Sequence, residues 1–345
     1  MRMNPALAQS TMLSRLGDAL SSHSTNEPLA VATEWGIRNE ALMRRAVDLQ
    51  LSLGTAVTGI ETTATRRRRR EFTEAAQFHN APGQRGAALR PAVNWHEGGD
   101  GPALMLLNGS TASGLVWPDW WLRRLEKRYR VIRVDNRGTG WSRCAPHPFT
   151  IGDLADDARN VLRACGIGRA TVLGMSLGGM IAQEFALRHP KAVERLVLVA
   201  TRPPTPAQIP SPSDALLSLM RTPPPGEDLR AFFVATWSTL VADGFAAQHP
   251  EVMAEVAEQI VRRVTQRRAV LNQARAIWSW HGAARLRRID APTTVVHGDR
   301  DPPLTVGNGM RLARLIPDAT YLELPGIGHL VPQEAGDLLL HVLES

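Results

Sequence analysis

A serine set among glycines is the strongest chemical signal in the chain. The segment Gly174-Met175-Ser176-Leu177-Gly178-Gly179 follows the apolar run Thr171 to Leu173 and opens Leu177 to Arg188, a stretch of helical composition. A serine on a sharp strand-to-helix turn exposes its hydroxyl, and the flanking glycines avoid backbone collisions that a Cβ would cause. The pattern predicts that Ser176 is a nucleophile. An ordinary glycine-rich turn is the competing interpretation.

A serine hydroxyl needs a base to remove its proton. Of the ten histidines, His329 lies downstream of the serine in Gly326-Ile327-Gly328-His329, after the last predicted strand. Three other histidines are interpreted as structural because of their positions: His297 lies inside a strand, His341 on the last helix and His281 in a helical region. We expect His329 to be the base.

The acid that orients this base is expected between the serine and the histidine in the chain. The segment His297-Gly298-Asp299-Arg300-Asp301-Pro302 ends a predicted strand and offers two aspartates. An aspartate directly after a glycine commonly accepts backbone hydrogen bonds in a turn, which suits Asp299. Asp301 reaches further into the loop, so we favour Asp301 and keep Asp299 as the alternative.

An oxyanion that forms during attack requires two convergent amides. The N–H of Leu177, which follows the nucleophile, is the first candidate. The second should come from Asn108-Gly109-Ser110-Thr111, after the run Ala103 to Leu107, and we expect it to be the N–H of Ser110. A simple tight turn is the alternative for this segment.

A second glycine-rich segment, residues 135–142, follows another β-branched run. Its glycines could suggest a phosphate cradle, but no Lys-Ser or Lys-Thr pair follows at the spacing of a phosphate-binding loop. We interpret it as a structural turn that anchors a loop near the nucleophile.

These residues must be positioned by strands that alternate with helices, which is typical of a mostly parallel sheet. We expect about eight strands, six of which have apolar or β-branched runs, at residues 103–107, 129–135, 170–175, 195–200, 293–297 and 320–324. Among the expected helices are residues 153–165, with Asp153 as the N-cap, and residues 333–343. The alternation of strands and helices starts near residue 91, stops near residue 201 and resumes near residue 289. Residues 91–201 and 289–345 would then form the core. The proline-rich and then helical segment 202–288 would form a cap, and residues 1–90 an N-terminal extension that is partly helical or disordered.

The combined motifs resemble the α/β-hydrolase superfamily from about residue 92 to the C-terminus. They are Leu106-Leu107-Asn108-Gly109, Asp135-x-Arg137-Gly138-x-Gly140-x-Ser142, Gly174-x-Ser176-x-Gly178-Gly179, Gly298-x-x-Asp301-Pro302 and Gly328-His329. Within that superfamily, Trp117-Pro118-Asp119 and the stretch from Leu315-Ile316-Pro317 to Pro325-Gly326 look like the aclacinomycin methylesterase branch.

The resemblance implies an eight-stranded α/β-hydrolase fold with a helical cap and a triad of Ser176, Asp301 and His329. It implies cleavage of a carboxylic ester through an acyl-enzyme, with no metal and no cofactor. Asn108 departs from the family, in which many members have histidine before the glycine. Loop anchoring is therefore expected to differ there.

Other activities remain open on the same scaffold. Carbon–carbon bond hydrolases, enol-lactonases and perhydrolases keep the serine, whereas haloalkane dehalogenases and epoxide hydrolases place an aspartate at that position. A non-catalytic ligand receptor is an alternative from another class.

Charge, apolar stretches and cysteine spacing indicate which kinds of partner the chain is expected to bind. The net charge is +7, and residues 1–90 contain 12 arginines against eight acidic residues, including the run Arg66 to Arg70. Without interleaved aromatic residues we interpret this run as a solvated basic linker rather than a nucleic-acid site. No apolar stretch reaches the roughly 20 residues of a membrane helix, and Cys144 and Cys165 form no disulfide framework or metal spacing. We expect a cytoplasmic enzyme that acts on a small apolar molecule without a membrane partner. The alternatives of a monomer and a homo-oligomer both stay open.

Overall fold

The computed structural model describes residues 93–145, 147–210, 215 and 218–344. Seven strands form one sheet in the order β1-β3-β2-β4-β5-β6-β7. β1 is antiparallel to β3, and all other neighbours are parallel. The strands are β1 (Trp95–Gly98), β2 (Ala103–Leu107), β3 (Arg130–Val134), β4 (Ala170–Met175), β5 (Val193–Val199), β6 (Thr293–Gly298) and β7 (Thr320–Leu324).

The α/β-hydrolase fold is thus confirmed, but with seven strands among the described residues rather than eight. β1 has no apolar run to indicate it, because this edge strand is only partly buried. The expectations for residues 1–90 lie outside the described residues.

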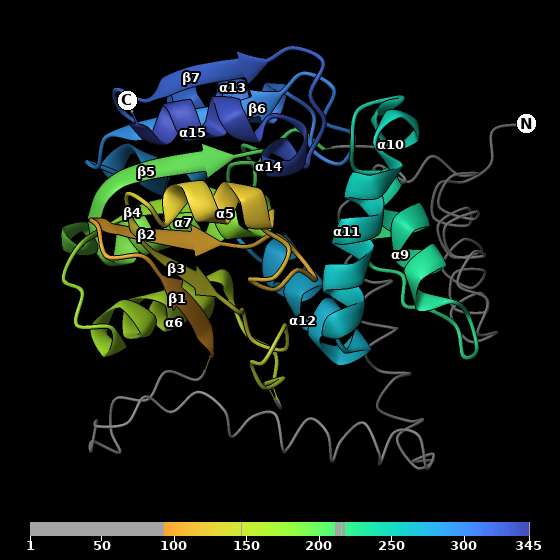
Figure 1. The fold of residues 1–345 in the computed structure, drawn as a ribbon. Helices are drawn as coiled ribbons and strands as arrows, with labels where there is room; N and C mark the ends of the chain where they lie inside the picture. Colours follow the sequence, from red (N-terminus) through yellow and green to blue (C-terminus); the bar gives the residue numbers. More distant parts are fainter. Residues whose placement is uncertain (1–92, 146, 211–214, 216–217, 345) are drawn as a thin grey trace, which may run out of the picture.

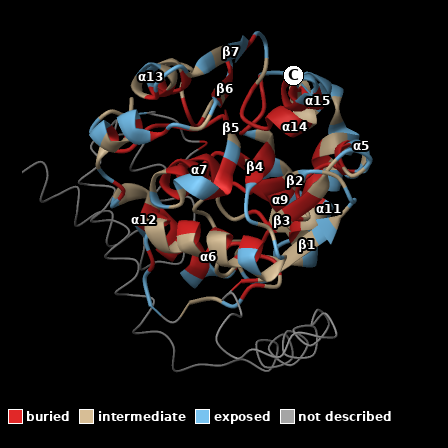
Figure 2. Ribbon diagram, turned by 90° about the vertical axis from the view of Figure 1, so that its left-hand side faces the viewer, coloured by how far each residue is buried: buried red, intermediate tan, exposed pale blue. Residues whose placement is uncertain are grey.

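Helices cover both faces of the sheet because the central strands are apolar on both sides. Leu104 and Leu106 pack toward α5 (Asp119–Leu125) and α15 (Gly336–Glu344). Met105 and Leu107 face α6 (Ile151–Ala164), α7 (Leu177–Arg188) and α13 (Gly307–Leu315). Each such side chain stabilises the fold by about 1.5–3 kcal/mol on burial. In Figure 2 the buried residues accordingly concentrate in the strands and on the inner sides of these helices.

Two helix boundaries differ from the sequence-based expectation. Asp153 was expected to cap α6, but the N-cap is Thr150, whose side chain accepts the N–H of Asp153, while Asp153 bonds back to the N–H of Thr150. This reciprocal capping box places the N-cap three residues earlier than the aspartate alone indicates. The last predicted helix, residues 333–343, divides into α14 (Val331–Glu334) and α15.

Between β5 and β6 the chain leaves the sheet, and we call residues 202–288 the helical insert. It contains α9 (Leu229–Ser238), α10 (Phe245–Gln248), α11 (Pro250–Arg262), α12 (Arg267–Trp278) and the short 3-10 helix η2 (Ala283–Arg288). In Figure 1 the arrowheads of β2 and β5 point toward these helices. The insert therefore lies at the carboxyl ends of the strands.

An ion pair fixes the end of the insert to the core. Both carboxylate oxygens of Glu184, on α7, accept hydrogen bonds from Arg285, at 3.0 and 2.8 Å, and one also accepts from Trp280 Nε1 at 3.1 Å. Burial alone would raise the pKa of Glu184, but these donors outweigh it and lower the pKa. No helix in the described part of the chain is long and apolar enough to cross a membrane.

Candidate active site

Ser176 lies at a strained turn where β4 passes into α7. Its backbone has φ 55° and ψ −118°, an unusual region for a residue other than glycine. Its N–H donates to Val199 O at 3.0 Å, and its carbonyl oxygen accepts from Thr201 Oγ1 at 2.7 Å. Both partners end β5 or follow it, so the neighbouring strand holds the strained residue in place.

The flanking glycines are required because the backbones approach closely here. A Cβ on Gly174 would lie 2.3 Å from Gly178 O, and a Cβ on Gly178 would lie 1.9 Å from Leu107 O. Real Cβ atoms do not approach oxygen so closely, so the helix packs directly against the ends of β2 and β4 only with glycine at both positions.

Asp301 and His329 are brought together from the loops that follow β6 and β7. His329 Nδ1 lies 2.8 Å from Asp301 Oδ2, while Asp301 Oδ1 accepts the N–H of Leu304 at 2.7 Å. The Asp301 side chain is fully buried. Burial opposes its charge, but the two histidines that contact it outweigh burial and lower the pKa of the carboxyl. Asp301 is therefore an ionised hydrogen-bond acceptor for the His329 ring.

Asp299, the alternative acid, has a different role. Its Oδ1 accepts the N–H of Gly326 at 2.7 Å and so joins the β6 and β7 loops. It makes no hydrogen bond to His329 among the described residues.

His297 is a site residue that the sequence reasoning did not assign to the site. Its Nε2 lies 2.8 Å from Leu304 O and 3.1 Å from Asp301 Oδ2. Because both neighbours are acceptors, Nε2 carries the proton, and Asp301 receives a second histidine donor. The available signal was spacing: His297 and Asp301 are four residues apart at the end of one strand.

The loop after β2, residues 108–111, lies directly against the serine. A Cβ on Gly109 would be 3.3 Å from Ser176 Cβ. The N–H groups of Ser110 and Leu177 donate no hydrogen bond within the part of the chain that the structure describes. Asn108 anchors the loop by donating from Nδ2 to Val134 O at 2.7 Å. No hydrogen bond joins Ser176 Oγ to His329 among those residues.

Asp135 makes the glycine-rich segment 135–142 a structural turn. Its fully buried carboxylate accepts the N–H of Trp141 at 3.0 Å and that of Gly114 at 2.7 Å. A carboxylate at the centre of the turn would repel a phosphate. It links this turn to the chain that continues from the loop after β2.

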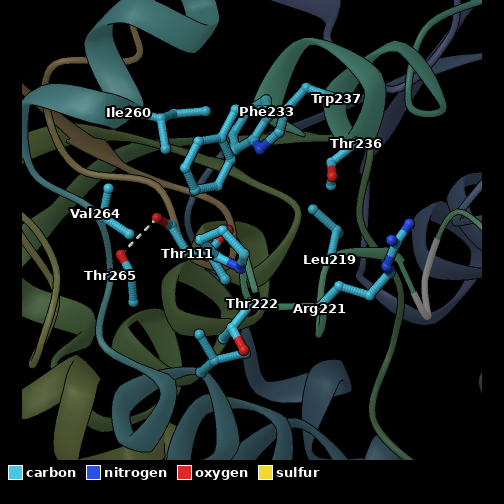
Figure 3. A pocket seen from close by; sticks show the side chains of 12 residues that line it. Thr111, Leu219, Arg221, Thr222, Phe233, Thr236, Trp237, Ile260, Val264 and Thr265 are labelled. Atoms are coloured by element: carbon cyan, nitrogen blue, oxygen red, sulfur yellow. Dashed lines mark hydrogen bonds between the residues drawn. The ribbon is translucent and has the colours of Figure 1, made fainter. Parts of the chain in front are cut away.

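A small cavity opens beside Thr111, between that loop and the helical insert (Figure 3). Its volume is about 20 Å³, enough for a water molecule or a group of methyl size. The lining is mostly apolar, with four threonines and one arginine among the twelve residues: Thr111, Leu219, Arg221, Thr222, Pro223, Phe233, Thr236, Trp237, Ile260, Val264, Thr265 and Val270. No group of three metal-binding side chains is placed to hold an ion in the described ranges.

The fold and the arrangement at the ends of β2, β4, β6 and β7 define the class of α/β hydrolases. The sequence profile of the alpha/beta hydrolase fold matches residues 102–335, so the chain belongs to this family and is a hydrolase.

Several similar proteins are named for the hydrolysis of esters, carbamates or lactones. Rhodomycin D methylesterase of Streptomyces peucetius is 28% identical over 265 residues, covering 69% of this chain and 89% of that protein. "Putative carbamate hydrolase RutD" of Variovorax paradoxus is 30% identical over 235 residues, covering 68% and 87%. The solved enol-lactonase from Burkholderia xenovorans LB400 superposes with a TM-score of 0.63 at 26% identity, covering 73% of this chain and 95% of that one. The expected resemblance to methylesterases is thereby confirmed.

Proposed function

We propose that the protein is a serine esterase that hydrolyses a carboxylic ester through an acyl-enzyme, with Ser176, His329 and Asp301 as its triad. The observation that carries the proposal is that a strained serine turn after β4 and a buried Asp301–His329 pair after β6 and β7 lie at the carboxyl ends of one mostly parallel sheet. Asp301 Oδ2 and His329 Nδ1 are 2.8 Å apart. The methylesterase relative supports an ester as the substrate.

The reaction has two halves. In the first, His329 Nε2 takes the proton of Ser176 Oγ as that oxygen attacks the ester carbonyl carbon. The imidazolium then gives this proton to the departing alkoxide, which leaves as an alcohol. In the second, His329 deprotonates water, which attacks the acyl carbon; the proton returns to Ser176 Oγ, and the carboxylic acid leaves.

Asp301 orients His329 and two backbone N–H groups stabilise the negative charge that forms on the substrate. The ionised Asp301 holds the Nδ1–H tautomer of His329 and stabilises the imidazolium, which is the role its low pKa suits. The N–H groups of Leu177 and Ser110 are free to receive the oxyanion, and Leu177 lies at the positive end of the α7 dipole. A hydrogen bond between serine and histidine often tightens only with substrate bound.

The helical insert is proposed to act as the cap over this site. The small, mostly apolar cavity beside Thr111 supports an apolar substituent of methyl size at that point of the substrate. A cyclic ester is the second candidate substrate, because the enol-lactonase fold superposes over 95% of its length.

The test compares p-nitrophenyl acetate, p-nitrophenyl butyrate, a lactone and an aryl carbamate as substrates of wild type and Ser176→Ala. We expect turnover with a burst in wild type, a fluorophosphonate label on Ser176, and loss of both in the variant. Lactone turnover well above ester turnover would favour the cyclic substrate. The esterase proposal fails if wild type shows no burst on any of these substrates and the probe does not label Ser176.

A further inference from the structure

Thr111, in the loop after β2, has a backbone conformation that a β-branched residue rarely adopts. Its φ is 61°, in the left-handed region, where the branched side chain crowds the backbone. Such a residue persists only where its surroundings fix it. It directly follows Ser110, whose N–H is the proposed second oxyanion donor.

The helical insert supplies the two groups that fix Thr111. The N–H of Thr111 donates to Gln273 Oε1 at 2.9 Å, and its carbonyl oxygen accepts from Thr265 Oγ1 at 2.8 Å. Figure 3 shows the second of these bonds at the edge of the cavity. Gln273 lies on α12 and is 1% exposed, and Thr265 precedes the same helix and is 8% exposed. Water therefore competes little with either bond.

The two hydrogen bonds orient the peptide groups on both sides of Thr111. The N–H belongs to the peptide that joins Ser110 to Thr111, and the carbonyl belongs to the next peptide. On the other side of Ser110, Asn108 is bonded to β3, and Gly109 lies against Ser176. With both flanks held, the orientation of the Ser110 N–H is set by contacts from the core and from the insert together.

We propose that Gln273 and Thr265 are positioning residues that hold Thr111 in its strained conformation and thereby aim the Ser110 N–H at the oxyanion. This inference rests on the proposed esterase function. The helical insert would then contribute to the rate of the chemical step, in addition to its proposed role as the cap over the substrate. A group that only aims an oxyanion donor acts in the transition state, so its loss lowers kcat more than it changes KM.

The first experiment uses a matched pair at one position. Thr265→Val removes the hydroxyl donor at nearly constant shape, whereas Thr265→Ser keeps it. We expect the valine variant to lower kcat for p-nitrophenyl butyrate about tenfold with KM within about threefold, because one misaimed donor costs less than the 10²–10³ of a deleted one. The serine variant should recover most of that loss.

The second experiment tests whether the backbone of Thr111 carries the effect. Gln273→Leu should also lower kcat about tenfold, but much less in a Thr111→Gly background, because glycine adopts the left-handed conformation without being held. Gln259→Leu is the control, since Gln259 lies on α11 and its side chain accepts a hydrogen bond from Arg262 at 3.1 Å, with no other side-chain bond to the described residues. It should leave kcat unchanged.

The outcomes separate this inference from the esterase proposal. If wild type is active through Ser176 but Thr265→Val and Gln273→Leu keep kcat within about twofold, the inference is overturned and the esterase stands. An equal loss for Gln273→Leu in the threonine and glycine backgrounds also overturns it. If Gln273→Leu does not fold, the Thr265 pair decides alone.

Discussion

Two aspartates in one loop have opposite surroundings, although only Arg300 separates them. Asp301 has a fully buried carboxylate with two histidines against it. Asp299 has a side chain that is 29% exposed and accepts one backbone N–H. A buried, ionised carboxylate that accepts hydrogen bonds from histidine rings can stabilise an imidazolium, whereas a partly exposed turn residue contributes chiefly to loop shape. The difference in burial therefore assigns the catalytic role to Asp301 and the structural role to Asp299.

The same substitution at both positions tests this assignment. Asp301→Asn should lower kcat by about 10⁴-fold, because an amide cannot stabilise the imidazolium and can favour the wrong tautomer of His329. Asp299→Asn should lower kcat less than about threefold, because its amide oxygen can still accept the Gly326 N–H. Thermal unfolding of both variants checks that each is folded. A large loss for Asp299→Asn with little for Asp301→Asn would exchange the two roles.

Much of the candidate site could be proposed from the sequence at this scale. Types and spacing were enough to select Ser176, Asp301 and His329, because each belongs to a short motif at the end of a strand. His297 was not selected. Its four-residue spacing from Asp301 was a weak signal, because most histidines inside strands have structural roles. The contact between the two side chains forms only once the loop folds back over β6.

At the scale of elements, one carboxylate joins two loops from distant parts of the chain. Glu334, on α14, accepts the N–H of Gly328 at 2.8 Å and that of Leu330 at 3.0 Å, on either side of His329. It also accepts the N–H of Ala242, from the helical insert, at 3.0 Å. The N–H of His329 itself donates to Leu240 O at 2.8 Å. The histidine loop is therefore fastened to the insert.

We expect Glu334→Gln to lower kcat about tenfold with little change in KM. The amide oxygen can replace one carboxylate oxygen, but the amide nitrogen would face a backbone N–H as a second donor and release that side of the loop. A displacement of His329 by 1 Å is sufficient for a loss of up to about 10². The control is Glu323→Gln, at an exposed residue of β7. An unchanged kcat in Glu334→Gln would show that the loop holds its shape without the carboxylate.

The contribution of Glu334 to the stability of the wild-type protein should depend on pH with a definite sign. Burial raises the pKa of Glu334, against the hydrogen bonds of Ala242, Gly328 and Leu330 and the nearby His329, which lower it. A raised pKa means that the folded protein binds this proton more tightly than the unfolded chain. Its contribution to stability is thus fully present below the ordinary glutamate pKa of about 4.3 and is lost as pH rises through the raised value.

Urea unfolding of wild type and Glu334→Gln across this window measures that contribution. The unfolding free energy of wild type minus that of the variant should fall with rising pH and then level off. A difference that rises with pH would mean that the folded state favours the ionised carboxylate, contrary to the raised pKa.

The elements themselves were predictable where the pattern was local. Six strands had apolar runs, and all six are present, whereas β1 had none and was missed. The ties between the insert and the catalytic loops were beyond prediction, because Thr111 and Gln273 are 162 positions apart and Ala242 and Glu334 are 92 apart. Such pairs depend on how the insert folds over the sheet, and composition carries no information on that.

At the scale of the whole molecule, charge and chemistry are separated along the chain. The candidate site residues lie between Asn108 and His329, whereas residues 1–90 carry more than half of the net charge of +7. A field from excess charge accelerates the encounter with charged ligands and leaves neutral ones unaffected. The arginine run should therefore matter little for a neutral ester.

Replacing Arg66 to Arg70 with glutamine should leave kcat/KM for p-nitrophenyl butyrate within about twofold of wild type, at low and at physiological salt. Binding to a fluorescent DNA duplex, followed by anisotropy, should stay in the non-specific range of about 10⁻⁴–10⁻⁶ M at physiological salt for both proteins. Saturating DNA should leave ester turnover unchanged. Sub-micromolar binding that the glutamine variant loses would instead make this run a nucleic-acid tether, because the affinity would then come from the five guanidinium groups that contact DNA phosphates.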